Sequence, residues 1–335
     1  MLRPSRSILE SFRGRKVLIA GDLVADQFLE GTISRVSREA PVFIMRHDST
    51  ETRPGGAANA AANIASLGGT PIVIGITGSD TNGELLRSAL FERAVNCDRV
   101  LRVEGVHTTT KVRVLAGQQY AARQQVIRID YESDLDEASE VESKLIASLE
   151  DAAEAAEAIV ISDYGYGAVS PGLFETAKRI AKERAIPLVA DSRFRLEAFI
   201  GASTATPNQD EVEHLLGPGF TEADCESLRR RLELDALLVT RGNKGMLLVE
   251  SNHDPLAIEA VGSTTPVDVT GAGDTVIAAY ALGLAAGLSF SEAASIANHA
   301  GGIVVMKRGT ATVTPDELLA SAADAAEGTA AKQSI

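Results

Sequence analysis

Short apolar runs alternate with longer stretches of helical pattern along most of the chain. Five apolar runs have the length of a buried strand, and they cover residues 16–21, 72–75, 158–161, 187–190 and 237–240. Helical spacing or composition marks residues 57–67, 82–94, 138–156, 171–183 and 222–232. This alternation predicts an α/β fold with a doubly wound, mostly parallel central sheet covered by helices, in a single domain spanning residues 1–335.

Two segments depart from this pattern. Residues 31–47 and 107–130 are rich in Thr, Val and Ile and alternate polar with apolar positions, which predicts strands with one exposed face. The acidic segment 134–157 is typical of a solvated helix face. Residues 321–335 are Ala-rich and polar, and we expect them to form a frayed tail.

A pair of glycines and a carboxylate precede an Ala- and Leu-rich helical stretch, residues 275–288. Gly271 and Gly273 allow a tight turn in which the amides from Gly271 to Gly273, Ala272 included, point at an anion with help from the helix dipole. Asp274 could then accept a proton from a substrate hydroxyl beside that anion. These features are typical of phosphoryl transfer, and the alternative is an ordinary glycine turn with Asp274 as helix cap.

The composition of the chain limits the kinds of molecule that the protein is expected to bind. Hydrophobic residues make up 45% of the chain and aromatic residues only 4%, so the core must consist mainly of Ala, Val, Ile and Leu. The net charge of −14, from 32 basic and 46 acidic residues, argues against nucleic acid or an anionic membrane as partner. Cys97 and Cys225 lack metal-site spacing, and neither a secretion signal nor a membrane-spanning run is evident, so we expect a cytoplasmic protein.

Two motifs resemble the signatures of the ribokinase-like (PfkB-type) carbohydrate kinases. They are D-x-T-G-A-G-D at residues 268–274 and P-G-G-A-A-N at residues 54–59, and the resemblance covers residues 15–320. It extends to the D-glycero-beta-D-manno-heptose-7-phosphate kinases, which are similar at residues 21–26, 34–42, 162–165, 206–208 and 309–310. The resemblance implies ATP-dependent phosphorylation of a sugar hydroxyl with Mg²⁺, and Asp274 as the base.

The same resemblance implies a lid and an acceptor. Residues 31–47 and 107–130 are similar to the family's β-sheet lid, which excludes water from the reacting phosphate. An apolar sheet face also favours a homodimer through the lid, and the alternative is an ordinary antiparallel edge. The implied acceptor is the anomeric hydroxyl of heptose 7-phosphate, which would yield a 1,7-bisphosphate, so the partners are small molecules.

Several residues are candidates for holding the acceptor. Gly55 and Gly56 allow close approach of a ligand at the start of the helix that carries Asn59. The resemblance assigns sugar hydroxyls to Asn59 and Asp26, although Asn59 could also be a helix cap. Five basic residues could neutralise the acceptor's phosphate or be solvated charges, and they are Arg35, Arg38, Lys111, Arg113 and Arg193.

Other candidates concern the nucleotide and ions. Asn208 and Glu211 resemble the family's N-x-x-E element, which supports Mg²⁺ through water, although Asn208 could be only a helix cap. By resemblance, three residues border the nucleotide, namely Thr240, Gly242 and Asn298. Asp268 and Thr270 either hold the loop or help to bind a monovalent cation, a trait of some relatives.

Two departures leave the acceptor open. Heptose kinases carry Lys at the position of Tyr166, and they carry Asp-Pro-Lys-Gly at the position of Asp191-Ser192-Arg193-Phe194. Another sugar or sugar phosphate is therefore an alternative acceptor. A dehydrogenase is disfavoured because no G-x-G-x-x-G follows the first strand, and no Walker P-loop is present. A non-catalytic sugar or nucleotide sensor remains a second class of function.

Overall fold

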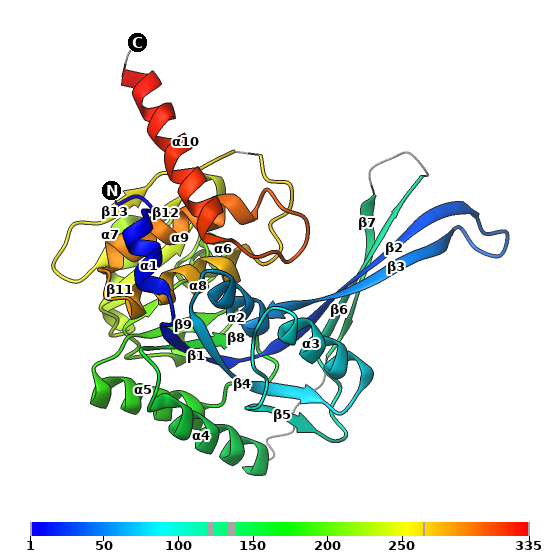
Figure 1. Ribbon diagram of the computed structural model, residues 1–335, viewed down its shortest axis with the longest axis horizontal. Helices are drawn as coiled ribbons and strands as arrows, with labels where there is room; N and C mark the ends of the chain where they lie inside the picture. The colour runs from blue at the N-terminus through cyan, green and yellow to red at the C-terminus, as the bar shows by residue number, and fades with distance from the viewer. Residues whose placement is uncertain (1, 119–122, 133–138, 264, 334–335) are drawn as a thin grey trace.

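A nine-stranded sheet forms the centre of the molecule. The computed structural model describes residues 2–118, 123–132, 139–263 and 265–333 (Figure 1). In spatial order the strands are β13 (Leu256–Ile258), β12 (Met246–Glu250), β11 (Ala236–Thr240), β10 (Thr204–Ala205), β9 (Leu188–Ser192), β8 (Ala158–Asp163), β1 (Lys16–Gly21), β4 (Thr70–Gly78) and β5 (Val100–Val103). Only the pairs β11–β12 and β12–β13 are antiparallel, so the predicted mostly parallel sheet is confirmed.

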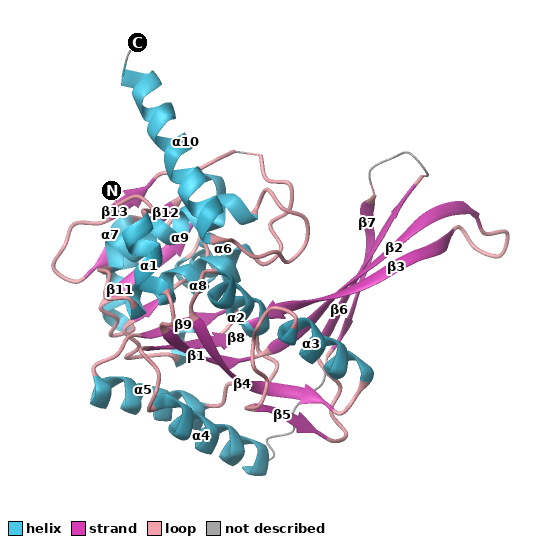
Figure 2. Ribbon diagram, in the orientation of Figure 1, coloured by secondary structure: helices cyan, strands magenta, loops and turns pink. Residues whose placement is uncertain are grey.

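Helices cover both faces of this sheet (Figure 2). They are α1 (Arg6–Phe12), α2 (Ala57–Ser66), α3 (Thr81–Phe91), α4 (Ser139–Ala153), α5 (Pro171–Arg184), α6 (Gln209–Leu216), α7 (Glu222–Arg231), α8 (Ala272–Ala285), α9 (Phe290–Val304) and α10 (Pro315–Gln333). Side chains of alternate strand residues pack into two separate cores on opposite faces of the sheet. Val17 and Ile19 pack on the side of α2, α8 and α9, whereas Leu18 packs on the side of α4 and α5.

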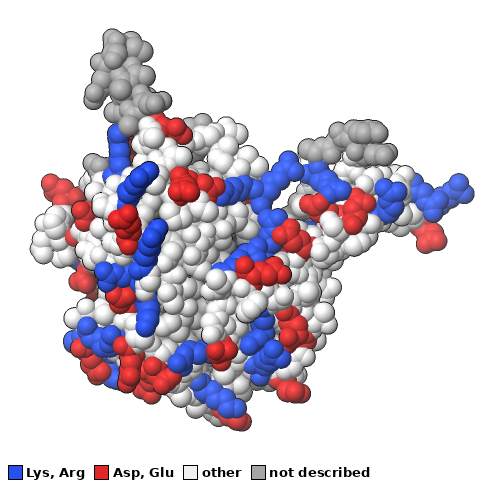
Figure 3. Space-filling model, in the orientation of Figure 1, with Lys and Arg blue, Asp and Glu red and all other residues white. Residues whose placement is uncertain are grey.

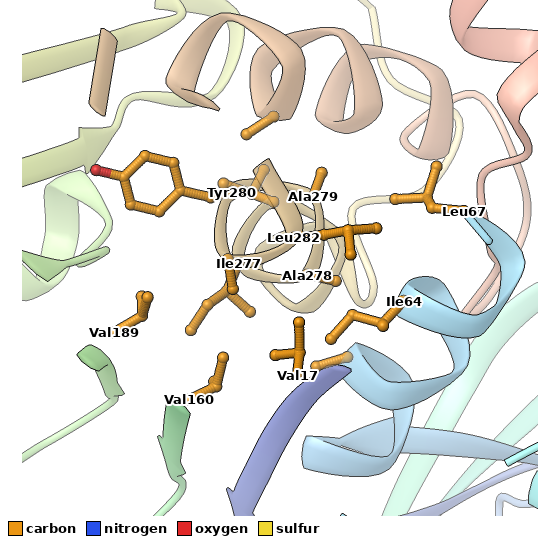
Figure 4. Close-up of a cluster of buried hydrophobic side chains, with 14 of the residues drawn as sticks. Val17, Ile64, Leu67, Val160, Val189, Ile277, Ala278, Ala279, Tyr280 and Leu282 are labelled. Atoms are coloured by element: carbon orange, nitrogen blue, oxygen red, sulfur yellow. The ribbon is translucent and has the colours of Figure 1, made fainter. Parts of the chain in front are cut away.

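Helix α8 is the most deeply buried helix of the first core. Its residues from Asp274 to Ala285 are all buried, as expected for a helix that is apolar on every side. Figure 4 shows Ile277 of α8 above Val160 of the sheet, with Val17 and then Ile64 of α2 to its right. The motif that is predicted to be catalytic therefore lies at the start of a helix that is packed into the core.

A second sheet of four strands projects from this body (Figure 1). Its order is β3 (Phe43–Gly56), β2 (Leu23–Val36), β6 (Thr110–Gly117) and β7 (Gln124–Tyr131). The strands extend further than the predicted segment 31–47, because the pairing of β2 with β3 starts at Leu23 and Gly56 beside the body. Figure 3 shows basic and acidic side chains interspersed over the visible face, with several basic ones along this lid.

Helix α10 extends into the segment that is predicted to fray. It continues to Gln333, the last residue that the structure describes, and fraying of residues 321–335 stays a prediction. Ala has the highest helix propensity of all residues, so an Ala-rich segment can continue a helix beyond its packed first turns. None of the helices in the described ranges is long and apolar enough to cross a membrane.

Candidate active site

The two glycine motifs meet at the carboxylate of Asp274. This residue lies in the first turn of α8 and is 3% exposed. Its Oδ2 accepts a hydrogen bond from Nδ2 of Asn59 on α2 at 2.9 Å, and its Oδ1 accepts one from the Tyr164 hydroxyl at 2.5 Å. The structure therefore brings the predicted base and the predicted sugar-binding amide into direct contact.

The surroundings of Asp274 adjust its acidity. Burial raises the pKa of the Asp274 carboxyl to about 6, while the hydrogen bonds from Tyr164 and Asn59 act in the opposite direction. The nearby Asp26 carboxyl also raises this pKa. A group with a pKa near 6 is ionised at neutral pH and still basic enough to accept a proton from a hydroxyl, as a general base must.

The turn before α8 provides part of the predicted anion cradle. Gly271 has a φ of 75°, and a Cβ atom there would lie 2.5 Å from Nδ2 of Asn59, so only glycine fits. The amide of Ala272 already donates to the carbonyl of Val269 at 3.2 Å. Within the described residues, the amides of Gly271 and Gly273 have no protein acceptor, which leaves these two to bind an anion.

A polar cavity of about 400 Å³ adjoins the base through Tyr164. Lys111 of β6 lines this cavity and is only 6% exposed, and its ammonium lies 5.9 Å from the ring centre of Tyr164 and 5.3 Å from that of Tyr166. No carboxylate of the described chain forms an ion pair with Lys111. Burial and the charge of Arg193 lower the pKa of Lys111, while the Asp26 and Asp130 carboxylates on the neighbouring strands act in the opposite direction. An unpaired buried cation of this kind favours an anionic ligand.

Two arginines also line this cavity, together with Asp130 and Glu132, and we call it the anion pocket. The predicted Arg193 has its guanidinium 5.5 Å from the ring centre of Phe194. Arg128 of β7 holds Asp130 through two hydrogen bonds of 2.8 and 2.9 Å and was not predicted from the sequence. Its only signal is the alternation Arg128-Ile129-Asp130, which places both charged groups on one face of the strand.

The remaining basic candidates lie elsewhere. Arg113 forms a buried ion pair with Asp26, and its guanidinium lies 5.5 Å from the ring centre of Phe28. Arg35 and Arg38 are exposed at the far end of the β2–β3 hairpin. Arg35 is nine residues beyond Asp26 on β2, about 30 Å at roughly 3.3 Å per residue. Within one chain, the structure therefore does not bring Arg35 and Arg38 to the anion pocket.

The glycines of the first motif shape the acceptor side. A Cβ atom on Gly55 would lie 2.5 Å from Oδ2 of Asp26, so this glycine lets the carboxylate approach the backbone. Gly56 has a φ of 57°, and a Cβ atom there would lie 2.7 Å from the carbonyl oxygen of Asp22. The structure thus assigns Gly55 to close packing against the Asp26 carboxylate and Gly56 to close packing against the backbone of Asp22.

The predicted nucleotide residues line one cavity of about 160 Å³. Thr240, Gly242 and Asn298 surround it together with Gly273, and apolar walls come from Val261, Val269 and Val305. Nδ2 of Asn298 donates to the carbonyl of Glu259 at 2.8 Å, which fixes this side chain at the wall. The cavity reaches Gly273 of the cradle, as a site for a nucleotide beside the transferring phosphate must.

Two acidic groups, Asp191 and Glu211, influence each other electrostatically, and Asp274 also acts on Asp191. Asn208 and Glu211 form a capping box at the start of α6, with the Glu211 carboxylate accepting from Nδ2 of Asn208 at 2.7 Å. Burial raises the pKa of Glu211. Burial, followed by the charges of Glu211 and Asp274, raises the pKa of Asp191 well above its usual range. This carboxylate pair was only partly predicted, because Asp191 was noted solely as a sequence departure.

The acidic pair fits a magnesium ion held mainly by water and phosphate. Mg²⁺ prefers oxygen ligands and commonly uses one or two carboxylates together with substrate phosphates. The described residues contain no cluster of three or more His, Cys, Asp or Glu side chains that could hold a metal by themselves. Asp191 and Glu211 would supply the carboxylates, and a bound cation would favour their ionised forms.

Asp268 holds the loop that carries the second motif. Its Oδ1 accepts the amide of Thr270 at 2.9 Å, and its Oδ2 accepts the amide of Gly309 at 2.8 Å. Both carboxylate oxygens therefore act in loop structure, which was one of the two predicted roles. A cation contact for Asp268 and Thr270 stays a prediction.

Comparisons with known proteins agree with this geometry. The family model described as "pfkB family carbohydrate kinase" matches residues 28–317. Proteins named "Bifunctional protein HldE" are 42% identical over 327 residues in Halorhodospira halophila and 39% identical over 317 residues in Nitrosococcus oceani. The alignments cover 93% and 92% of this chain, and the chain spans 64% of the length of each relative.

Solved structures share the fold. Arabidopsis thaliana ribokinase, complexed with ribose and ATP, has a TM-score of 0.69 at 20% identity, covering 92% of this chain and 99% of that one. Escherichia coli phosphofructokinase-2 in complex with potassium has a TM-score of 0.70 at 21% identity, covering 92% and 98%. The chain belongs to the pfkB family of carbohydrate kinases, enzymes that transfer a phosphoryl group to a sugar hydroxyl.

Proposed function

We propose that the protein uses ATP to phosphorylate the anomeric hydroxyl of D-glycero-beta-D-manno-heptose 7-phosphate, which yields the 1,7-bisphosphate. The observation that carries the phosphosugar assignment is the unpaired, buried ammonium of Lys111 in the anion pocket. The pocket shares Tyr164 with the base, so an acceptor could place its own phosphate beside Lys111 and a hydroxyl at Asp274. The heptose itself is supported by the sequence resemblance and by 42% identity to a protein named HldE.

The proposed reaction follows from the geometry at α8. Asp274 accepts the proton of the acceptor hydroxyl, whose oxygen forms a bond to the γ-phosphorus of ATP as the bond to the ADP oxygen breaks. The amides of Gly271 and Gly273 stabilise charge on the transferring group. When bound, Mg²⁺ neutralises phosphate charge, and Asp191 and Glu211 would hold it. The lid excludes water, the competing acceptor.

The two departures from the heptose kinase pattern have structural counterparts. The Tyr166 hydroxyl donates to Glu132 at 3.1 Å, and its ring faces the Lys111 ammonium, so Tyr166 adds an aromatic wall where relatives carry a cation. Arg193 keeps one positive charge at the pocket. Lys111 and Arg193 together still suit a phosphate, which supports a phosphorylated acceptor over a neutral sugar.

A direct assay tests this proposal. ADP release is measured with heptose 7-phosphate, the unphosphorylated heptose and a panel of other sugars and sugar phosphates at equal concentrations. We expect kcat/KM to be highest for the heptose 7-phosphate. Equal turnover of neutral sugars would overturn the phosphosugar assignment, a preference for another phosphosugar would replace the heptose, and no turnover of any sugar would favour a sensor.

We also propose a homodimer formed through the lid. The strand register places Ile127 and Ile129 of β7 beside Val114 and Val112 of β6, on the face opposite to Lys111. Ile127 and Ile129 are 54% and 41% exposed, and the neighbouring Tyr131 is 52% exposed. An identical apolar face on a second chain would cover these side chains in a symmetric dimer.

A further inference from the structure

Tyr164 contacts three parts of the candidate site. Its hydroxyl donates to Oδ1 of Asp274 at 2.5 Å, and its ring lines the anion pocket with the Lys111 ammonium 5.9 Å from the ring centre. The ring also packs on the first glycine motif, because a Cβ atom on Gly56 would lie 3.4 Å from Cε2 of Tyr164. No other side chain in the described site connects the acceptor pocket to the base in this way.

The side chain of Asp22 holds the backbone around Tyr164 in place. The Asp22 carboxylate accepts the amides of Tyr164, Tyr166 and Ala168 at 2.7, 3.1 and 3.0 Å. Asp22 is 2% exposed, so these bonds lie in a region that solvent does not reach. The Tyr164 hydroxyl is therefore held at Asp274 by its own segment and needs no ligand to bring it there.

We propose that Tyr164 is a positioning residue that stabilises the ionised form of Asp274 and orients its carboxylate for the acceptor hydroxyl. The inference deepens the proposed function and rests on Asp274 acting as the base. An ionised carboxylate offers about four lone-pair sites, and Tyr164 and Asn59 occupy one on each oxygen. The remaining sites stay available for the acceptor hydroxyl, whose direction of approach the two bonds define.

The charged groups that face Asp274 come from several elements. They are Asp26 of β2, Lys111 of β6, Tyr164 after β8 and Asp191 of β9. The two carboxyl groups favour neutral Asp274, whereas Lys111 and the hydrogen bonds from Tyr164 and Asn59 favour the carboxylate. Replacing Tyr164 by Phe removes one of these hydrogen bonds and leaves every formal charge in place, so it isolates the contribution of the hydroxyl.

The first test is the pH profile of kcat/KM for Tyr164→Phe. We expect the midpoint of the acidic limb to move to higher pH by about one unit, which corresponds to a tenfold change in the protonation equilibrium of Asp274. Tyr166→Phe is the matched control, because its hydroxyl contacts Glu132 and not Asp274. Its acceptor KM is free to change, but its acidic limb should stay in place. An unmoved limb in Tyr164→Phe, or an equal movement in both variants, would overturn the proposal.

The second test does not depend on activity or on the identity of the sugar. The free energy of unfolding is measured from pH 4 to 8 for the unsubstituted protein and for Asp274→Asn, and the same pair is repeated with Tyr164→Phe added to both. Because burial raises the pKa of Asp274 to about 6, the unsubstituted protein should lose stability relative to Asp274→Asn as the pH rises to about 6, and no further above it.

When both members of the pair carry Tyr164→Phe, the loss of stability relative to the Asp274→Asn member should continue until about pH 7. An identical end point in the two pairs would overturn the proposal, and so would failure of Tyr164→Phe to fold, because a hydroxyl that only positions a side chain is dispensable for folding. If the kinase assay fails but the end point moves, the effect of Tyr164 on Asp274 stands and the proposed function does not.

Discussion

Lys111 offers the most informative substitution in the anion pocket. Its ammonium is buried, and the described residues include no carboxylate that forms an ion pair with it. In Lys111→Met the side chain keeps a similar length and apolar body but loses the charge. A charge-assisted hydrogen bond contributes about 1.5–3 kcal/mol. The KM for a phosphorylated acceptor should therefore rise by about 10- to 150-fold, while the KM for ATP stays nearly unchanged.

The same substitution should not reduce stability. Burial lowers the pKa of Lys111, so the charged form is less favourable in the folded protein than in the unfolded chain. This penalty is fully present at a pH below the folded pKa and is lost as the pH rises through the unfolded value. Removing the charge at pH 7.5 should leave Tm equal or higher, which is a common trade between stability and function.

Steady-state kinetics and thermal unfolding measure both effects. Acceptor KM is determined at saturating ATP for the unsubstituted protein, for Lys111→Met and for Lys182→Met, a control on α5. An acceptor KM within twofold of the unsubstituted value would refute the role of Lys111 in binding phosphate. A clear fall in Tm would refute the argument that its charge is unpaired in the folded state.

Four further results are expected. Asp274→Asn keeps the size of the side chain but removes the base, so kcat should fall about 10²- to 10⁴-fold with ATP affinity retained, and near-normal turnover would exclude this role. Activity of the unsubstituted protein should fall as the pH drops through about 6, because protonation of Asp274 removes the base. An acidic limb of the pH–activity profile centred well above pH 7 would point to another group. Arg193→Ala should raise the acceptor KM tenfold or more. Arg35→Ala should leave the acceptor KM unchanged, since Arg35 lies about 30 Å along β2 from Asp26. A larger acceptor KM in Arg35→Ala than in Arg193→Ala would contradict this assignment. Sedimentation at micromolar concentration should show a dimer that Ile127→Asp dissociates, and a monomer before substitution would exclude the lid interface.

The sequence predicted five strands of the body, and the family resemblance assigned both glycine motifs to one site. Apolar runs of strand length and helical spacing are local signals, so β1, β4, β8, β9 and β11 could be predicted from them. The short strand β10 carries too few residues to show any period. Asn59 and Asp274 lie 215 residues apart, and only the family resemblance indicated that they belong to one site.

The missed residues depend on long-range packing that no local pattern reports. Arg113 was predicted to bind phosphate but is paired with Asp26, because the register of β6 against β2 places the two side chains together. Arg35 shares the basic character of Arg193, but its position along a projecting strand removes it from the pocket of its own chain. Tyr164 was noted only as part of a motif, since its contact with Asp274 arises from the meeting of β8 and α8.

The central claim is that this kinase acts on a sugar that already carries a phosphate. Its most direct test is a comparison of kcat/KM for heptose 7-phosphate and for the same heptose without phosphate, with the product identified by phosphorus NMR. We expect a preference of tenfold or more for the phosphorylated sugar, about 1.4 kcal/mol or above, and a second phosphate on the anomeric oxygen. Equal kcat/KM for the two sugars would contradict it.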